Sequence, residues 1–392
     1  MLPGDPLPGR PAWAEIDLDA LTENVRALKD QARPAGLIAM VKANAYGHGA
    51  VMVARAAVEA GADRLGVTCV DEGVELREGG VTAPILILGH TPPHDAERTV
   101  RYDLTPTVNG RDLADALSRH AVALGRTVPV HVKLDSGMNR YGLPEEGLLD
   151  LAAYLRRLPG LQVEGLYTHF AAADEADKAF TREQFRRFQA VAARLPWIPL
   201  RHAANTAGLL DLPETALDFV RCGIGLYGYY PSDEVRRDAP LRPVLSLKSR
   251  LVRLRRLEPG ETVGYGRTWT ARRPSLVGLA AVGYGDGYRR ALSNRAHVLV
   301  RGRRAPVAGR VSMDQTTIDI TDVPGVQEGD EVVFIGTQGE EVVTADELAA
   351  LCDTISYEIL TGISARVPRV YLRQGRVVAV QSLVQPPAAV PR

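Results

Sequence analysis

The 392-residue chain lacks three features that would point to particular classes of protein. Its apolar runs are far shorter than the roughly 20 residues that cross a bilayer, and its first residues lack the apolar segment of a secretory signal. The 47 basic and 47 acidic residues cancel, so we expect neither nucleic acid nor a membrane surface as a partner. We therefore expect a cytoplasmic protein.

Cysteine is also scarce, and no metal-binding pattern is present. Cys69, Cys222 and Cys352 are too far apart for a C-x-x-C motif, and the eight histidines contain no H-E-x-x-H sequence. We interpret the cysteines as buried thiols of a reducing compartment and predict no metal site.

Lysine accounts for only five of the 47 basic residues, which makes the position of Lys42 informative. Lys42 follows the apolar run 37–41 and precedes a turn of small residues. Burying an ammonium is costly and favours the neutral, nucleophilic amine, whereas arginine stays protonated. Lys42 therefore indicates amine chemistry such as a Schiff base to a carbonyl cofactor. The alternative, a lysine whose ammonium reaches solvent from a strand end, stays open on the local sequence alone.

The length suggests two domains, and the first shows a regular alternation of elements. Eight short apolar segments predict strands, and amphipathic stretches between most of them predict helices, as in a parallel α/β fold. This number of strands predicts an N-terminal (β/α)8 TIM-type barrel over residues 12–243. The predicted strands are 37–41, 65–70, 85–88, 104–108, 128–134, 163–169, 200–204 and 219–224. The predicted helices are 20–32, which Asp19 or Thr22 would cap, and 51–60, 111–123, 145–158 and 177–195.

After the predicted linker 231–243, the sequence pattern changes from alternating strands and helices to strands separated by turns. Alternating apolar and polar residues separated by Gly, Pro and Asp turns predict a mainly β domain over residues 244–384, with one helix at 344–352. Its predicted strands are 244–254, 275–282, 297–300, 307–311, 316–320 and 331–335. The proline-rich ends, 1–11 and 385–392, are predicted to be flexible tails.

Polar clusters follow five of the predicted barrel strands, at the end where active sites of this architecture lie. They are Lys42 to Tyr46, Lys133 to Arg140, Thr168-His169, His202 to Thr206 and Arg221 to Gly228. The glycines and Thr206 after the last two strands offer N–H groups and a hydroxyl to a phosphate, although each glycine alone is equally a turn residue. A Schiff-base lysine and a phosphate cradle at one end of a barrel together predict pyridoxal 5′-phosphate as the cofactor.

A series of motifs runs through both predicted domains. They are VKANAYGHG, KLDSGMNRYG, YTHFAAAD, HAANTAG, RCGIGLYG, VGYGRTW, VGYGDGYRR, GRVSMDQ, and YEIL followed by RVPRVY. In content and order the series resembles the bacterial alanine racemase family, from about Trp13 to Tyr371. The resemblance implies a pyridoxal-phosphate enzyme that interconverts L-alanine and D-alanine and supplies D-alanine for peptidoglycan. It also implies a homodimer whose active sites use residues of both subunits.

The resemblance gives roles to four catalytic residues. Lys42 would bind the cofactor and handle the α-proton on the D-alanine face, while Tyr265 of the other subunit would act on the L face. An ordinary tyrosine has a pKa near 10, so it needs help to act as a base, and His169 and Arg221 would supply a hydrogen-bonded chain. Arg221 would also face the pyridine nitrogen and disfavour its protonation, which limits side reactions.

Further residues match the family by motif. Tyr46, Thr206, Gly223, Ile224 and Tyr357 would bind the cofactor phosphate, Arg140 and Met313 would contact the substrate or cofactor, and Asp174, Arg290, Arg310 and Ile355 would line the entrance. Lys133 resembles a lysine that is carbamylated in this family and would hold Arg140, with an ordinary ion pair to Asp135 or another acid as the alternative. For His202, core packing and a supporting role near the cofactor remain open. Tyr284 and Asp314 are either site or turn residues.

Three other functions are alternatives for a protein built on this barrel. A broad-specificity amino-acid racemase would need a wider entrance, a basic amino-acid decarboxylase would need no second base at Tyr265, and a non-catalytic pyridoxal-phosphate carrier would lack the β domain. Two positions depart from the family pattern without removing a required group: Thr206, where serine is also common, and Ser312, where some relatives have cysteine.

Overall fold

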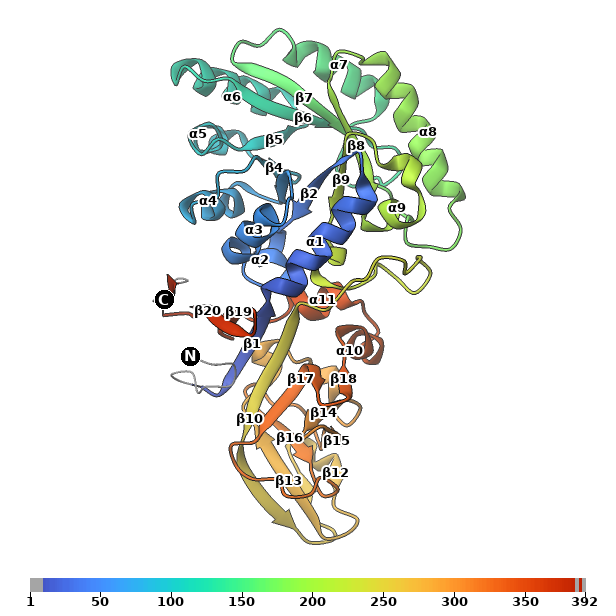
Figure 1. Ribbon diagram of the computed structural model, residues 1–392. Coiled ribbons are helices and arrows are strands. Elements are labelled where there is room, and N and C mark those ends of the chain that lie inside the picture. The colour runs from blue at the N-terminus through green and yellow to red at the C-terminus, as the bar shows by residue number, and fades with distance from the viewer. Residues whose placement is uncertain (1–9, 385–387, 390–392) are drawn as a thin grey trace. The chain divides into compact units, whose positions relative to one another are not determined.

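The computed structural model describes residues 10–384 and the backbone of 388–389, which form two compact units (Figure 1). The barrel unit comprises residues 20–45 and 50–242, and the β unit comprises the segment up to Asp19, residues 46–49 and the chain from Pro243 onward. In the described part of the chain, no helix has the length and apolar character needed to cross a membrane.

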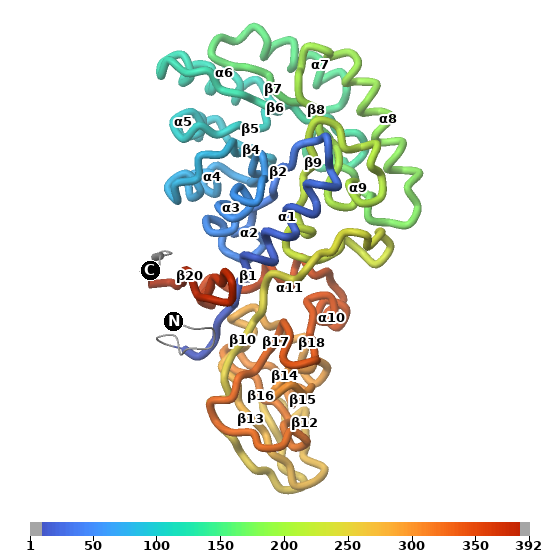
Figure 2. Tube along the Cα trace, in the orientation of Figure 1, coloured from blue at the N-terminus to red at the C-terminus, as the bar shows by residue number. Residues whose placement is uncertain are grey.

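The barrel unit is built on a closed ring of parallel strands, which confirms the predicted fold class (Figures 1 and 2). The ring closes where the last strand pairs with the first, with Val220 opposite Leu37. Its strands are β2 (Gly36–Met40), β3 (Arg64–Val67), β4 (Ile85–Ile87), β5 (Thr105–Val108), β6 (Val128–Lys133), β7 (Leu161–Tyr167), β8 (Leu200–Asn205) and β9 (Phe219–Cys222). All eight coincide with predicted strands to within a few residues.

Helices cover the outside of the barrel, and the longer ones do so with one apolar face. In α6, for example, Leu113, Leu117 and Ala121 are buried at a spacing of four residues. The helices are α1 (Leu18–Ala32), α3 (Ala50–Glu59), α4 (Val70–Glu78), α5 (Ala96–Arg101), α6 (Arg111–Ala123), α7 (Glu145–Leu155), α8 (Ala179–Arg194) and α9 (Thr206–Asp211). The sequence did not predict α4, α5 and α9, which have at most nine residues each and show little periodicity. Asp19 and Thr22 lie inside α1, and Asp17 instead accepts the Asp19 N–H at its start.

The β unit contains a large mixed sheet, as predicted for the C-terminal domain. Among the described residues the order β15-β14-β17-β10-β1-β19-β20-β21 forms its main path, with β13, β16 and β18 attached at the side. These strands are β1 (Ala12–Asp17), β10 (Leu245–Leu257), β13 (Ser275–Ala280), β14 (His297–Val300), β15 (Arg303–Pro306), β16 (Thr316–Asp319), β17 (Glu331–Gln338), β18 (Glu341–Val343), β19 (Arg369–Arg373), β20 (Arg376–Gln381) and β21 (Ala388–Ala389). Two helices, α10 (Ala345–Leu351) and α11 (Ser356–Thr361), and a small hairpin of β11 (Thr262–Val263) and β12 (Trp269–Thr270) complete it.

The structure differs from the sequence prediction at three places in this unit. The predicted barrel begins at residue 12, but β1 pairs with β10 and β19, so the chain enters the barrel unit only at Ala20. The strand predicted at 307–311 is wrong, since only Val307 of that segment makes an isolated bridge. The strand lies just before it, as β15, and the sequence did not predict it because its exposed arginines interrupt the apolar pattern. Of the predicted tails, the described residues include only Arg10, Pro11 and the backbone of Ala388–Ala389. Arg10 pairs with buried Asp286 at 2.6 Å, and Ala388–Ala389 form β21, which pairs with β20.

Candidate active site

Lys42 opens a turn of unusual backbone conformation at the end of β2. In α2 (Lys42–Tyr46), Ala43, Asn44 and Ala45 have φ of 51 to 54° and ψ of 46 to 53°, which is the left-handed helical region. Tyr46 continues it with φ of 52°. Each non-glycine residue in this region costs roughly 1–2 kcal/mol, so the rest of the fold must stabilise the turn.

Side chains hold the backbone of this turn in place. The two carboxylate oxygens of Glu72 accept the N–H groups of Ala43 at 2.7 Å and Thr68 at 2.6 Å, which ties the ends of β2 and β3 to helix α4. The side chain of Asn44 accepts the N–H of Ala50 at 2.9 Å and so connects the turn to helix α3. The lysine therefore sits on a backbone that is fixed on both sides.

The amine of Lys42 is in an environment that favours its neutral form. Burial lowers the pKa of Lys42, the nearby charge of Arg140 lowers it further, and only Glu72 opposes this shift. Among the described residues, none forms a hydrogen bond with its Nζ atom. These features favour the reactive amine over the lysine that merely reaches solvent.

Lys133, at the end of β6, is a second lysine with a depressed pKa. Burial, together with Arg221 and Arg140, lowers the pKa of Lys133 to about 8. Its alternative partner Asp135 accepts the N–H groups of Gly137 and Asn139 instead, at 2.9 and 3.0 Å. Within residues 10–384, no carboxylate lies at ion-pair distance from Lys133, so the ion pair that was the alternative for this lysine is not formed.

Arg221, in β9, is a buried cation held by neutral groups. Its guanidinium donates to the carbonyls of Thr168 at 2.7 Å and Ala203 at 2.8 Å and to Nδ1 of His202 at 2.7 Å. Burial lowers the pKa of Arg221 to about 10, which still leaves it charged near neutrality. The described part of the chain shows no ion pair to Arg221, so its charge is not neutralised from within the barrel.

His169 follows β7 and lies against the same guanidinium. Arg221 Nη2 is 3.3 Å from His169 Nδ1, and because arginine only donates, Nδ1 is the acceptor. Burial and the charge of Arg221 hold the pKa of His169 well below its ordinary value. The neutral ring therefore carries its proton on Nε2, which is free to donate to another group.

The predicted phosphate-binding residues of the barrel lie together after β8 and β9. The hydroxyl of Thr206 accepts the N–H of Gly223 at 3.1 Å, and both Thr206 and Ile224 are buried. A Cβ on Gly225 would lie 2.8 Å from the Thr206 methyl, so only glycine allows these two turns to approach. In the β unit, the rings of Tyr46 and Tyr357 have centroids 6.1 Å apart and are tilted by 47°.

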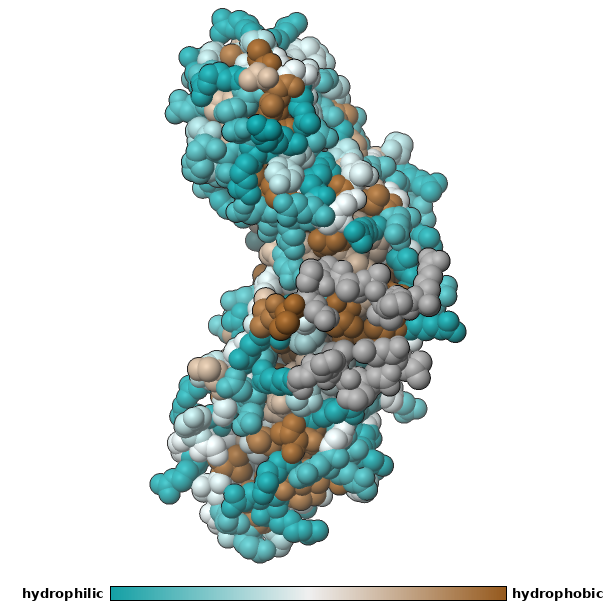
Figure 3. Space-filling model, turned by 90° about the vertical axis from the view of Figure 1, so that its left-hand side faces the viewer, coloured by the Kyte–Doolittle hydropathy of each residue, from teal (hydrophilic) through white to brown (hydrophobic). Residues whose placement is uncertain are grey.

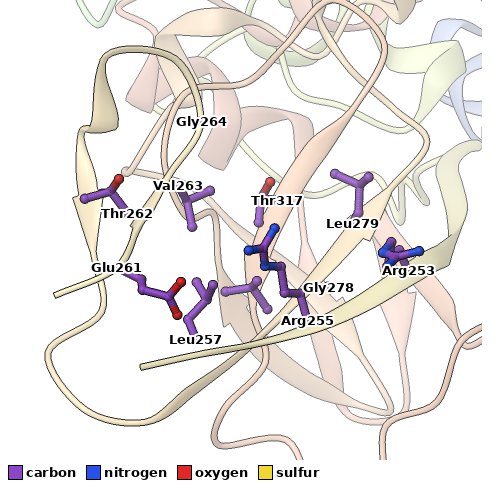
Figure 4. A pocket seen from close by; sticks show the side chains of 11 residues that line it. Arg253, Arg255, Leu257, Glu261, Thr262, Val263, Gly264, Gly278, Leu279 and Thr317 are labelled. Carbon is purple, nitrogen blue, oxygen red and sulfur yellow. The ribbon is translucent and has the colours of Figure 1, made fainter. Parts of the chain in front are cut away.

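Tyr265 lies at the tip of the hairpin formed by β11 and β12. Gly264 and Gly266 on either side have φ near 70°, and Tyr265 is 71% exposed. Beside the hairpin, a cavity of about 310 Å³ is lined by apolar side chains such as Leu257 and Val263 and by polar ones such as Arg255 and Glu261 (Figure 4). None of the predicted site residues lines this cavity.

Other predicted residues of the β unit are exposed or structural. Met313 and Ile355 are 53% and 57% exposed, and Tyr284 is also exposed. Asp314 pairs with Arg366 at 2.8 Å, which favours the turn role for this aspartate.

The predicted entrance residues do not form one group within a single unit. Arg310 lies against the Tyr265 hairpin, 3.4 Å from a Cβ built on Gly266, and Arg290 is exposed in the same unit. Asp174 belongs to the barrel unit, where its carbonyl accepts a hydrogen bond from Ser232.

On the face drawn in Figure 3, most residues are hydrophilic and the hydrophobic ones form scattered groups. Within the residues that the structure describes, no cluster of three or more His, Cys, Asp or Glu side chains is placed to hold a metal ion.

Comparison with known proteins agrees with this arrangement. The family models described as alanine racemase N-terminal domain and alanine racemase C-terminal domain match residues 16–231 and 244–371. The chain belongs to the alanine racemase family. It is thus an enzyme of the isomerase class, and the family resemblance in the sequence is confirmed.

Relatives match along nearly their whole length. The alanine racemases of Desulfosudis oleivorans and Symbiobacterium thermophilum are each 49% identical in sequence to this chain. Each alignment covers 92% of this chain, and it covers 96% of the first relative and 97% of the second. Among solved structures, alanine racemase of Clostridium difficile 630 has a TM-score of 0.92 at 38% identity, covering 96% of this chain and all of that one. The Bacillus anthracis alanine racemase, solved with bound L-Ala-P, has a TM-score of 0.90 at 38% identity, covering 97% and 99%.

Sequence reasoning missed Glu72. It occupies the third position of α4, where a capping-box glutamate stands, but the preceding cap residue is Cys69 rather than serine or threonine. The signal was therefore incomplete.

Proposed function

We propose that this enzyme interconverts L-alanine and D-alanine with pyridoxal 5′-phosphate, by proton transfer from two opposite sides, and so provides D-alanine for peptidoglycan. The proposal rests on the presence, in the same barrel, of a lysine with a lowered pKa, Lys42, and a buried cation, Arg221, that has no ion pair among the described residues. Lys42 follows β2 and Arg221 lies in β9, which are neighbouring strands.

The chemistry of the donor set fits this cofactor. Lys42 Nζ would hold it covalently, Thr206, Gly223 and Ile224 would bind its phosphate, and Tyr46 and Tyr357 would contribute from the β unit. Arg221 would face the ring nitrogen, where a permanent cation disfavours a second positive charge. When bound, the cofactor supplies an electron sink that acidifies the α-carbon of an amino acid.

The residues of this chain then move the proton. Lys42 Nζ would take or return it on one face of the α-carbon, and Tyr265 Oη would do so on the other. His169, whose Nε2–H is directed away from Arg221, would donate to the Tyr265 oxygen and stabilise its deprotonated form. Arg140 would bind the substrate carboxylate, helped by Met313, and a carbamate on Lys133 would hold Arg140 by charge.

The exposure of Tyr265 supports a homodimer with shared sites. A base that is 71% exposed is open to water, and a catalytic position requires that water be excluded. A second subunit covering the Tyr265 hairpin, Met313 and Ile355 would provide that enclosure. We place Asp174, Arg290, Arg310 and Ile355 at the entrance of the shared site, where a narrow passage selects a small side chain.

The test is to incubate the purified, cofactor-loaded protein with single L-amino acids in heavy water. Loss of optical rotation together with α-deuteration is expected for L-alanine, and much slower change for L-serine and L-lysine. Equal rates for all three would replace the alanine assignment with a broad-specificity racemase, and the absence of α-deuteration would refute both. Growth of a D-alanine-requiring bacterium that expresses this chain would test the peptidoglycan role.

A further inference from the structure

A chain of five hydrogen-bonded polar side chains runs through the interior of the barrel. Arg221 Nη1 lies 2.7 Å from His202 Nδ1, and His202 Nε2 lies 2.9 Å from His131 Nδ1. His131 Nε2 lies 3.2 Å from Glu164, whose two oxygens accept both terminal nitrogens of Arg64 at 2.6 and 2.8 Å. The interior of such a barrel is ordinarily filled by branched apolar side chains, so a row of hydrogen-bonded polar side chains there calls for a physical explanation.

The strands are locally shaped to admit it. In the pairing of β6 with β7, Val130 is opposite Val163 and His131 is opposite Gly165, which leaves Glu164 as an extra residue in a β-bulge. Bulges redirect a side chain and are common near active sites. A Cβ on Gly165 would lie 2.3 Å from the His131 ring, so glycine is required there to make room for the imidazole.

Only one arrangement of protons satisfies every contact. Arginine can only donate, so His202 Nδ1 accepts and its proton sits on Nε2. That proton is donated to His131 Nδ1, which places the His131 proton on Nε2, where the Glu164 carboxylate accepts it. From Arg221 to His131, every donor thus points toward Glu164, and Arg64 donates to the same carboxylate from the other end. Although burial opposes it, hydrogen bonds from His131 and Arg64 lower the pKa of Glu164 to about 2, so the acceptor stays ionised.

We infer that Glu164 is a positioning residue that fixes the tautomers of His131 and His202, and through them the orientation and free charge of Arg221. If His131 carried its proton on Nδ1, two donors would meet at 2.9 Å unless His202 moved its own proton to Nδ1. His202 would then present a donor to the Arg221 guanidinium at 2.7 Å. The carboxylate at the far end prevents this reversal.

The two imidazoles also separate opposite charges. A carboxylate placed directly on Arg221 would neutralise the cation, whereas two neutral rings orient it and leave its charge available. Tyr167 stacks on His202 with centroids 4.7 Å apart and planes within 7°, so it restrains the tilt of that ring. The consequence for catalysis rests on the proposed function, in which Arg221 faces the cofactor nitrogen, but the tautomer assignment does not.

The experiment measures ring tautomers in protein labelled with ¹⁵N-histidine, by long-range proton–nitrogen correlation with and without cofactor. In the wild type, both His131 and His202 should be Nε2–H, assigned by comparison with His131→Gln and His202→Gln. In Glu164→Leu, which offers no acceptor, His131 should shift to Nδ1–H or a mixture, His202 should follow, and kcat should fall about tenfold or more. Glu164→Gln keeps an acceptor oxygen and should retain both tautomers.

Two further variants separate this role from general damage. Arg64→Leu combined with Glu164→Leu removes the unpaired arginine, and it should behave like Glu164→Leu alone. Asp150→Asn breaks the exposed Arg111–Asp150 ion pair on the outside of the barrel and should change neither tautomers nor kcat.

Wild-type rings that are not both Nε2–H would overturn the inference. So would full recovery in the double variant, or a loss of kcat in Glu164→Leu without a tautomer change. Because the wild-type spectrum needs no variant and no activity, the inference stays testable if Glu164→Leu fails to fold. If the protein fails to racemise alanine, the tautomer measurement still stands, which distinguishes the two failures.

Discussion

The carboxylate of Glu72 accepts the backbone N–H of Ala43 at 2.7 Å, one residue after Lys42. This bond stabilises the first residue of the left-handed turn, while the other oxygen of Glu72 binds the N–H of Thr68. The catalytic lysine of the proposal is therefore positioned by helix α4, through a residue that makes no hydrogen bond to the lysine itself.

We expect Glu72→Ala to weaken this positioning. Loss of two hydrogen bonds to a charged acceptor should reduce the free energy of unfolding by about 2 kcal/mol and should lower kcat more than it raises KM. Chemical denaturation and steady-state kinetics measure the two effects. Glu78→Ala, on the exposed side of the same helix, is the control, and an equal loss of kcat in both variants would contradict the positioning role.

Tyr265→Phe should abolish racemisation without affecting stability. The side chain is 71% exposed, so removing its hydroxyl should leave the melting temperature within about 1 °C, whereas loss of one of the two bases should lower kcat at least about 100-fold. Exchange of the α-proton of D-alanine, the side assigned to Lys42, should be retained better than full racemisation. Unchanged racemisation by this variant would remove Tyr265 from the mechanism.

Lys133 should react with carbon dioxide more readily than an ordinary lysine. With its pKa at about 8 instead of 10.5, roughly a tenth of the amine is neutral at pH 7, and the neutral form is the one that adds CO2. Protein equilibrated with ¹³C-bicarbonate should show a carbamate signal that grows as pH rises toward 8 and is absent in Lys133→Arg.

The same pKa shift has a stability consequence in protein kept free of CO2. Between pH 8 and 10.5 the unfolded chain binds more protons at this lysine than the folded chain does, so stability should rise with pH across that window. Lys133→Met, which cannot titrate, should lack this component of the pH dependence.

Gly47→Ala should destabilise the β unit. Gly47 has φ of +86°, and a Cβ there would lie 2.3 Å from the carbonyl oxygen of Leu360, so we expect a loss of roughly 3 kcal/mol or more. Gly147→Ala is the matched control, since Gly147 lies inside helix α7 with only ordinary contacts and should gain about 0.5–1 kcal/mol. Thermal unfolding of both variants checks the opposite signs.

Much of the fold was predictable because its signals are local. Strands such as 128–134 are apolar runs bounded by turns, and helices such as 111–123 have a regular apolar face, so their order alone indicates a parallel barrel. Strand β1 was not predictable in this way, because it pairs with β10 and β19, which lie more than 200 residues further along the chain. Strand β15 was missed because Arg303 and Arg304 interrupt the apolar pattern.

The sequence by itself determined which residues this enzyme has available: a rare lysine after a barrel strand, polar turns at the strand ends, and the motifs of the alanine racemase family. Only the tertiary structure decided how they are supported. Glu72 reaches the lysine turn from a helix 30 residues away, and Glu164 reaches Arg221 through two histidines on other strands. Such support depends on contacts between side chains of different strands and helices. These contacts cannot be predicted from the spacing or periodicity of residues along one segment.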